Sequence, residues 1–173
     1  NNLKSESLQV GQQDTIFKFT DRFPNNAQIA FAIIKDGQTT YYGIMRKNDT
    51  LITIQNSDKA FEIGSITKVF TATILANLVM DGRLKLDDRI NAKFDYPFNK
   101  NIEFTYKELA NHTSGLPRLP SNMRFAAIFN PSDPYKNYDD KKLDDYLKND
   151  VSLDYPKGSK SEYSNLGMGL VAY

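Results

Sequence analysis

Residues 62–82 read EIGSITKVFTATILANLVMDG, a Gly-Ser pair followed by an almost unbroken apolar run that contains one lysine, Lys68. The pattern predicts a helix from Gly64 to Asp81-Gly82, because glycine readily adopts the left-handed conformation that ends a helix. Ser65 and Lys68 are three positions apart, so they lie on one helix face, one turn apart. This stretch therefore places a hydroxyl at a helix N-terminus within reach of an amine.

A serine and a lysine at this spacing form the S-x-x-K pattern of serine hydrolases that use a lysine. The free N–H groups at a helix N-terminus favour an oxyanion near Ser65, and a neutral lysine can take the proton of a serine. A chain with 11 serines and 16 lysines contains about one such match by chance. The alternative is an N-cap serine with a lysine whose stem reaches out to water. The apolar neighbours of Lys68 favour the catalytic interpretation.

Such chemistry needs a second group to carry the proton to the leaving group, and another to hold the substrate amide. Tyr163-Ser164-Asn165 is the candidate, since residues i and i+2 of an extended segment project to the same side. A second Tyr-x-Asn match begins at Tyr135, within an Asp/Pro-rich loop typical of a solvated segment. We prefer Tyr163 because it directly precedes a predicted helix. The alternative is a packed loop tyrosine with Asn165 as an N-cap.

The remaining sequence predicts one domain with a sheet part and a mostly helical part. A polar tail over residues 1–13 precedes a helix over 14–23. Strands over 28–35 and 39–46 flank Asp36-Gly37, the strongest short signal for a hairpin, and residues 48–56 add a short third strand. The first strand is apolar at successive positions, which indicates cover on both faces. Further helices are expected within residues 105–113 and 139–149. We therefore expect residues 14–60 to form the sheet part and residues 61–173 the helical part.

Composition excludes several classes of function. A net charge of +1 over 173 residues provides no field that would attract nucleic acid. No cysteine and one histidine, His112, are present, so disulfides, thiolate sites and His-rich metal sites are excluded, and we expect no metal or cofactor. No stretch has the apolar length of a transmembrane segment.

In combination, these segments resemble the serine β-lactamase superfamily, in the branch of class C β-lactamases, D-alanyl-D-alanine carboxypeptidases and related esterases. The matching segments follow the family order: the hairpin, residues 61–90, ELANHTSGLPRLP at 108–120 and EYSNLGMGLVAY at 162–173. The resemblance implies that Ser65 is the acylated nucleophile, Lys68 its hydrogen-bonded partner and Tyr163 the proton-transfer group. It also implies that Asn165 contacts the substrate amide. Either Lys68 or Tyr163 is the base in acylation. His112 is expected to be structural, part-buried and hydrogen-bonded.

The expected fold is an incomplete α/β (α+β) fold of the β-lactamase/transpeptidase type. The family's third motif, Lys or His followed by Thr or Ser and Gly, is absent, together with the strand that supplies one of two oxyanion N–H donors. The apolar helix that opens at 165 has only about two turns, fewer than a stable helix needs. We therefore expect a piece of a longer protein, inactive by itself, whose sheet is completed by C-terminal sequence or by a second chain.

The resemblance implies a small-molecule substrate, either a β-lactam or a D-alanine-terminated peptide of the peptidoglycan type, and an exported bacterial protein whose signal was removed. Three alternatives stay open. The protein could be an esterase or D-aminopeptidase of the same fold. It could be a non-catalytic penicillin-binding or sensor domain that acylates and does not deacylate. The scaffold could also carry no chemistry.

Overall fold

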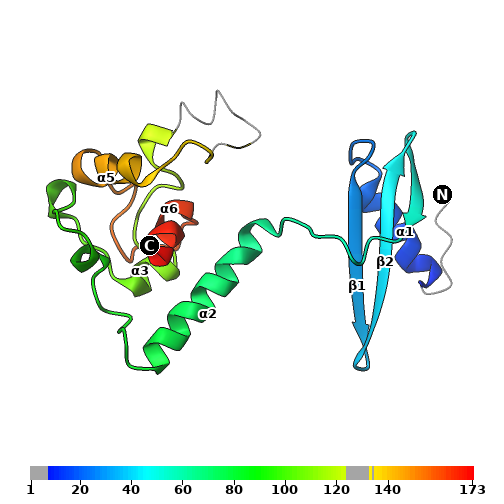
Figure 1. The fold of residues 1–173 in the computed structure, drawn as a ribbon, viewed down its shortest axis with the longest axis horizontal. Coiled ribbons are helices and arrows are strands. Elements are labelled where there is room, and N and C mark those ends of the chain that lie inside the picture. Colours follow the sequence, from blue (N-terminus) through cyan, green and yellow to red (C-terminus); the bar gives the residue numbers. More distant parts are fainter. Residues whose placement is uncertain (1–7, 124–132, 134) are drawn as a thin grey trace. The chain divides into compact units, whose positions relative to one another are not determined.

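The computed structural model describes residues 8–123, 133 and 135–173. The chain divides into two compact units between Glu62 and Ile63, and each unit is described by itself. In the first unit, helix α1 (Val10–Thr20) packs on a three-stranded antiparallel sheet (Figure 1). The strand order is β1 (Gln28–Lys35), β2 (Gln38–Lys47), β3 (Thr50–Ile54). The predicted hairpin and third strand are thereby confirmed.

Helix α1 begins four residues before the expected start at residue 14. Its first turn is closed at Gln9, whose carbonyl oxygen accepts hydrogen bonds from Gln12 N and Gln13 N and whose own N–H donates to Gln12 Oε1 at 3.0 Å. Glutamine is not among the favoured N-cap residues, so no local signal marks this start in the sequence. The predicted polar tail is therefore wrong from Val10 onward, and residues 1–7 of that tail lie outside the described residues.

The sheet is covered on one face within this unit. In β1, alternate residues are half-buried, and Ile29, Phe31 and Ile33 pack against the core that contains Ile16 of α1. The other face leaves Ile34 exposed. The expectation of cover on both faces is thus not met within the unit, because α1 is the one helix that it contributes among the described residues.

Gly43, in the middle of β2, has the side chain of Asn56 directly over its α-carbon. A β-carbon there would lie 2.1 Å from Asn56 Oδ1 and 2.5 Å from the Ile54 carbonyl oxygen. We expect Gly43→Ala to lower the free energy of unfolding by about 1–3 kcal/mol, because one of these groups must move. Thermal and urea unfolding would measure this loss.

The matched control for that substitution is Gly11→Ala in α1, where an added β-carbon meets nothing within 4 Å. Alanine is favoured over glycine inside a helix by about 0.5–1 kcal/mol, so this variant should be neutral or more stable. Equal stability of the two variants would contradict the packing of Asn56 over Gly43.

Among the described residues of the second unit, the regular elements are helices joined by loops. The expected helix over 64–82 is a 3-10 turn, η1 (Gly64–Ile66), that continues into α2 (Thr67–Met80). The other predicted helices are α3 (Tyr106–Ala110) and α5 (Asp140–Asn149). The remaining elements are η2 (Ile90–Lys93), η3 (Asn99–Asn101), η4 (Ser121–Met123) and α6 (Asn165–Ala172).

Capping residues account for the ends of these helices. Thr105 Oγ1 accepts from Glu108 N at 3.1 Å, while Glu108 accepts from Thr105 N at 2.9 Å, a capping box at the start of α3. Asp139 accepts from Lys142 N at 3.0 Å and caps α5. After α2, Gly82 adopts φ +69°, as a helix-ending glycine should.

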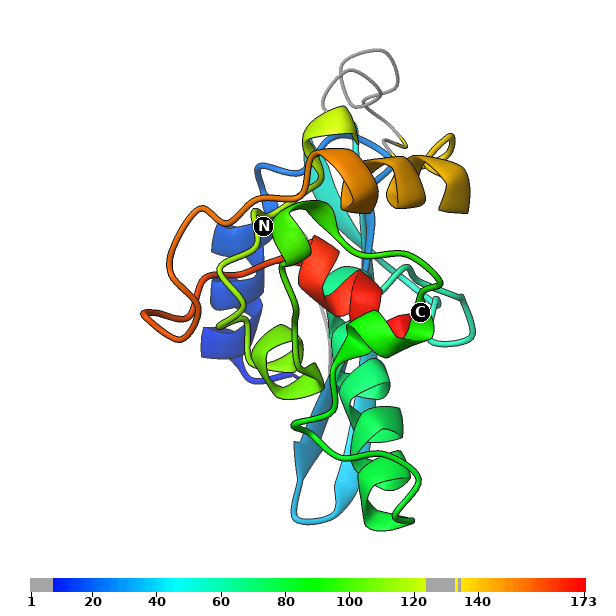
Figure 2. The ribbon, with the colours of Figure 1, turned by 90° about the vertical axis from the view of Figure 1, so that its left-hand side faces the viewer.

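Helix α6 lies at the centre of the second unit, with α3 and α2 against it (Figure 2). The buried core combines residues of α3, α5 and α6 with those of the loops between them, and α2 contributes Leu75. Most other apolar residues of α2, such as Val69, Phe70 and Met80, are exposed within this unit. The helix that looks buried in the sequence is therefore covered on one side only.

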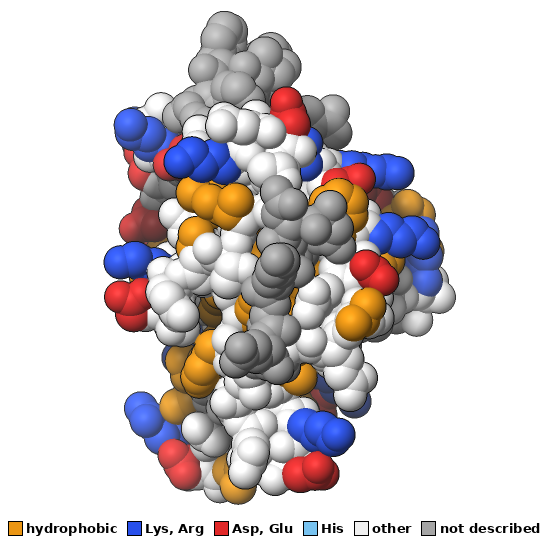
Figure 3. Space-filling view, turned by 90° about the vertical axis from the view of Figure 1, so that its right-hand side faces the viewer, with side chains coloured by type: hydrophobic (Ala, Val, Ile, Leu, Met, Phe, Trp, Pro, Cys, Tyr) orange, Lys and Arg blue, Asp and Glu red, His pale blue; other side chains and the backbone are white. Residues whose placement is uncertain are grey.

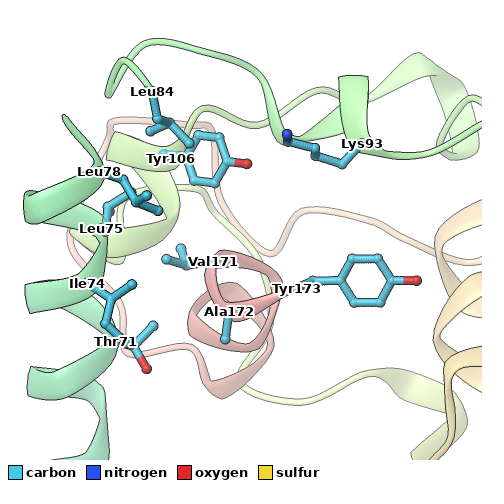
Figure 4. A pocket seen from close by; sticks show the side chains of 10 residues that line it. All are labelled: Thr71, Ile74, Leu75, Leu78, Leu84, Lys93, Tyr106, Val171, Ala172 and Tyr173. Atoms are coloured by element: carbon cyan, nitrogen blue, oxygen red, sulfur yellow. The ribbon is translucent and has the colours of Figure 1, made fainter. Parts of the chain in front are cut away.

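An open apolar groove separates parts of α2 and α6. It has a volume of about 380 Å³, and Ile74 and Leu75 point from α2 towards Val171 of α6 (Figure 4). The N-terminal parts of the same two helices line a second groove, to which Lys68 and Asn165 both contribute. The packing of α2 against α6 therefore places these two residues near each other.

Acidic and basic side chains are interspersed on the surface of the molecule. Figure 3 shows lysine and arginine side chains next to aspartate and glutamate side chains on one face, consistent with the net charge of +1. No described helix has both the length and the hydropathy that crossing a membrane requires.

Candidate active site

Ser65 lies in the 3-10 turn that leads directly into α2, not in the α-helix itself. Gly64 before it adopts φ +54°, a conformation that favours glycine, and this allows the tight entry into the turn. Lys68 follows in the first turn of α2 and its Nζ donates to Ser65 Oγ at 3.2 Å. The one-turn spacing thus brings the two side chains into contact. Within this unit Ser65 is exposed and Lys68 is half-buried, so the apolar burial expected for Lys68 is only partial.

Tyr163 is 98 residues away in sequence and meets the same hydroxyl. Its phenol oxygen lies 2.5 Å from Ser65 Oγ. The next residue, Ser164, caps α6 by accepting from Gly167 N at 2.9 Å. Tyr163 therefore directly precedes the residue that caps α6.

Two segments that are distant in sequence, residues 112–118 and 154–166, run side by side and carry Tyr163 to Ser65. Backbone hydrogen bonds join them at four points and tie the loop before Tyr163 to the segment after α3. These bonds run from Asp154 N to Gly115 O (2.8 Å), Gly158 N to Thr113 O (2.8 Å), Glu162 N to His112 O (2.8 Å) and Asn165 N to Arg118 O (3.0 Å).

His112 packs against the ring of Tyr163 and accepts a hydrogen bond from the next residue, Ser164. The two ring centroids are 4.9 Å apart, and His112 Nδ1 accepts from Ser164 N at 3.3 Å. Burial, and then the charge of Lys68, lower the pKa of His112. Both causes favour the neutral imidazole, which has an unprotonated nitrogen available to accept this bond. His112 is half-buried and hydrogen-bonded, which is the structural arrangement that the sequence predicts.

Asn165 occupies a different local structure from the one expected. It is the first residue of α6 and not part of an extended segment with Tyr163, because Ser164 starts the helix between them. Its side chain still lines a groove of about 420 Å³ together with Ser65 and Lys68. Asn165 Nδ2 donates to the phenol oxygen of Tyr135 at 3.0 Å, while its Oδ1 is buried and has no hydrogen-bond partner among the described residues.

Tyr135 is a further member of this site, although its sequence context predicts a solvated loop. It lines the same groove as Ser65 and contacts Asn165. Its own Tyr-x-Asn match has no bearing on this contact, since the asparagine it meets is Asn165 and not Asn137. No local signal predicts it, because the contact depends on where the loop before α5 lies against α6.

The electrostatics of the site centre on Tyr163. Hydrogen bonding with Lys68, and then with Ser65, lowers the pKa of the Tyr163 phenol, and the charges of Lys68 and Arg118 act in the same direction. Ser65 Oγ therefore lies within hydrogen-bonding distance of both an amine and a phenol whose pKa is lowered. Among the residues that the structure describes, no group of histidine and acidic side chains is arranged to hold a metal ion.

Comparison with known proteins gives consistent matches. A family model described as Beta-lactamase matches residues 20–173. A beta-lactamase of Psychrobacter immobilis is 30% identical over 152 residues, which is 84% of this chain and 33% of that protein. A beta-lactamase of Providencia stuartii is 34% identical over 135 residues, or 76% of this chain and 30% of that protein. The chain therefore spans about a third of the length of these curated relatives.

Proposed function

This chain belongs to the Beta-lactamase family, and on that premise we propose that the protein containing it is a serine hydrolase that works through an acyl-enzyme on Ser65. The observation that carries the proposal is that Ser65 Oγ lies 3.2 Å from Lys68 Nζ and 2.5 Å from the Tyr163 phenol oxygen. Both groups lie within hydrogen-bonding distance of the hydroxyl, which supports their roles as its proton-transfer partners.

In the proposed acylation, Ser65 Oγ attacks the carbonyl carbon of an amide or ester, and its proton passes to the phenolate form of Tyr163. Tyr163 is favoured over Lys68 as the first acceptor because its oxygen is closer to Ser65 Oγ. Its lowered pKa also increases the fraction of phenolate, the form that can accept a proton. As the scissile bond breaks, that proton moves to the leaving nitrogen or oxygen. Water then attacks the ester carbonyl, the bond to Ser65 Oγ breaks, the acyl group leaves as a carboxylic acid, and a proton from that water restores the hydroxyl. We assign the contact with the substrate amide to the side chain of Asn165, which lines the groove together with Ser65.

The relatives are beta-lactamases by name, so a β-lactam is the first substrate class to test, followed by a D-alanine-terminated peptide. An ester or a D-amino-acid amide would react by the same steps, since each offers a carbonyl and a leaving group. We further propose that the protein acts outside the cytoplasmic membrane of a bacterium, where such substrates occur.

The test uses the full-length protein with four probes: a chromogenic cephalosporin, a D-alanyl-D-alanine peptide, a p-nitrophenyl ester and D-alanine p-nitroanilide. Intact mass after penicillin treatment reports the acyl-enzyme. Turnover of one probe assigns the substrate class, and a persistent adduct on Ser65 without turnover identifies a sensor. Absence of both an adduct and turnover with every probe would overturn the proposal.

Replacing Tyr163 with phenylalanine is expected to slow acylation by about 10²–10⁴-fold, the usual contribution of a general acid–base group. The ring and its contact with His112 are retained, so the folded structure should survive. Stopped-flow measurement of acylation would give the rate. Tyr155→Phe, in the loop before Tyr163, is the control, since Tyr155 packs against Lys160 and not against Ser65. Equal rates for the two variants would exclude a proton-transfer role for Tyr163.

A further inference from the structure

Arg118 contacts Tyr163 in two ways. Its guanidinium carbon lies 5.0 Å from the centroid of the Tyr163 ring, the same distance as Lys68 Nζ. Its main-chain carbonyl oxygen accepts from Asn165 N at 3.0 Å and from Leu166 N at 3.2 Å. One residue therefore touches the phenol with its side chain and holds the first turn of the following helix with its backbone.

We propose that Arg118 is a positioning residue for the Ser65 site, whose guanidinium packs against the Tyr163 ring and supplies a second positive charge next to it. The proposal rests on the function proposed above, in which Tyr163 moves a proton. It concerns the side chain of Arg118, because its carbonyl contacts with α6 would be made by any residue at this position.

The groups that face Tyr163 come from three places in the second unit. Ser65 and Lys68 approach from η1 and α2, His112 from the segment after α3, and Arg118 from further along that same segment. Burial and then the charge of Lys68 lower the pKa of His112, which disfavours its charged form. The charged neighbours of the phenol are thus Lys68 and Arg118, and both favour the phenolate over the phenol.

The sign of the effect follows from this arrangement. Loss of the Arg118 charge removes an interaction that favours the phenolate, so the pKa of Tyr163 rises. Below that pKa the phenolate fraction then falls, and the limb of the pH profile in which the rate increases with pH moves to higher pH. Because Arg118 is exposed, we expect a loss of about twofold to fivefold in acylation rate on this limb.

The experiment measures the pH dependence of acylation for the full-length protein and for Arg118→Gln, Arg118→Lys and Arg83→Gln. Arg83 is an exposed arginine beyond the far end of α2, about 20 Å along the helix from Lys68, so its replacement makes the same charge change away from the site. We expect an alkaline shift of the limb for Arg118→Gln, a smaller shift for Arg118→Lys, and none for Arg83→Gln. Added salt should reduce the difference between the parent protein and Arg118→Gln, because it screens exposed charges.

A second readout does not require catalysis. In protein labelled with [¹³Cζ]tyrosine, the Tyr163 resonance is assigned from its absence in Tyr163→Phe, and its titration reports the phenol directly. An alkaline shift in Arg118→Gln but not in Arg83→Gln supports the proposal, even if no substrate is turned over. Superimposable Tyr163 titrations for the parent and Arg118→Gln overturn the role of Arg118. A parent protein that forms no acyl-enzyme overturns the proposed function instead, so the two failures are distinguishable.

Discussion

The Ser65→Ala variant of the full-length protein should lose acylation by about 10⁴-fold or more, because the nucleophile itself is removed while the rest of the site stays in place. Ser65 is exposed within its unit, so the substitution opens no buried cavity and the melting temperature should change little. Two side chains would lose a partner, since Lys68 Nζ and the Tyr163 phenol both bond to Ser65 Oγ. Intact mass after exposure to a β-lactam would show no adduct.

Ser152→Ala is the matched control, at an exposed serine in the loop after α5. It should form the adduct at the parent rate. Acylation of the Ser65→Ala variant at an unchanged rate would place the nucleophile elsewhere and would leave the contacts of Ser65 without a catalytic meaning. Loss of the adduct in both variants would instead point to a general effect on folding.

Gly115→Ala is expected to cause the largest loss of stability, about 3–5 kcal/mol, and with it a loss of activity. Gly115 adopts φ +76°, and a β-carbon there would lie 2.1 Å from the backbone carbonyl oxygen of Tyr155. The left-handed backbone and the steric overlap each cost about 1–3 kcal/mol. In the variant, this overlap would fall within residues 112–118 and 154–166, the two segments that carry Tyr163 and in which Gly115 O accepts from Asp154 N. The free energy of unfolding in urea and the acylation rate should therefore fall together.

A substitution at Gly158 distinguishes the cost of the left-handed backbone from the cost of the steric overlap. It has φ +75°, nearly the same as Gly115, but a β-carbon there meets nothing within 4 Å. Gly158→Ala should therefore show the backbone cost alone, about 1–2 kcal/mol, and the difference between the two variants measures the steric overlap with Tyr155. Equal losses in both would show that residues 112–118 and 154–166 are not packed as closely as described.

Most of the secondary structure follows from local sequence signals. Asp36 and Gly37 adopt φ +52° and +75° in the hairpin turn, as the Asp-Gly pair predicts. Thr105 and Asp139 cap the helices that begin after them. The start of α1 at Val10 is not predicted, because glutamine is a weak indicator of a helix start. These features depend on a few neighbouring residues. The sequence alone therefore predicts them where those residues have a strong preference, as at Thr105, and not where they have none, as before Val10.

The contacts of the site also differ in whether neighbouring residues are enough to predict them. The contact of Ser65 with Lys68 needs one helical turn, so the three-residue spacing in the sequence is enough to determine it. Three other contacts join residues that are distant in sequence. Tyr135 and Asn165 are 30 positions apart, Arg118 and Tyr163 are 45 apart, and Ser65 and Tyr163 are 98 apart. Their geometry depends on the backbone pairing of residues 112–118 with 154–166 and on the packing of α6 against α2. Such contacts arise only when the chain is folded, because each element is positioned by its neighbours in space and not by its neighbours in sequence.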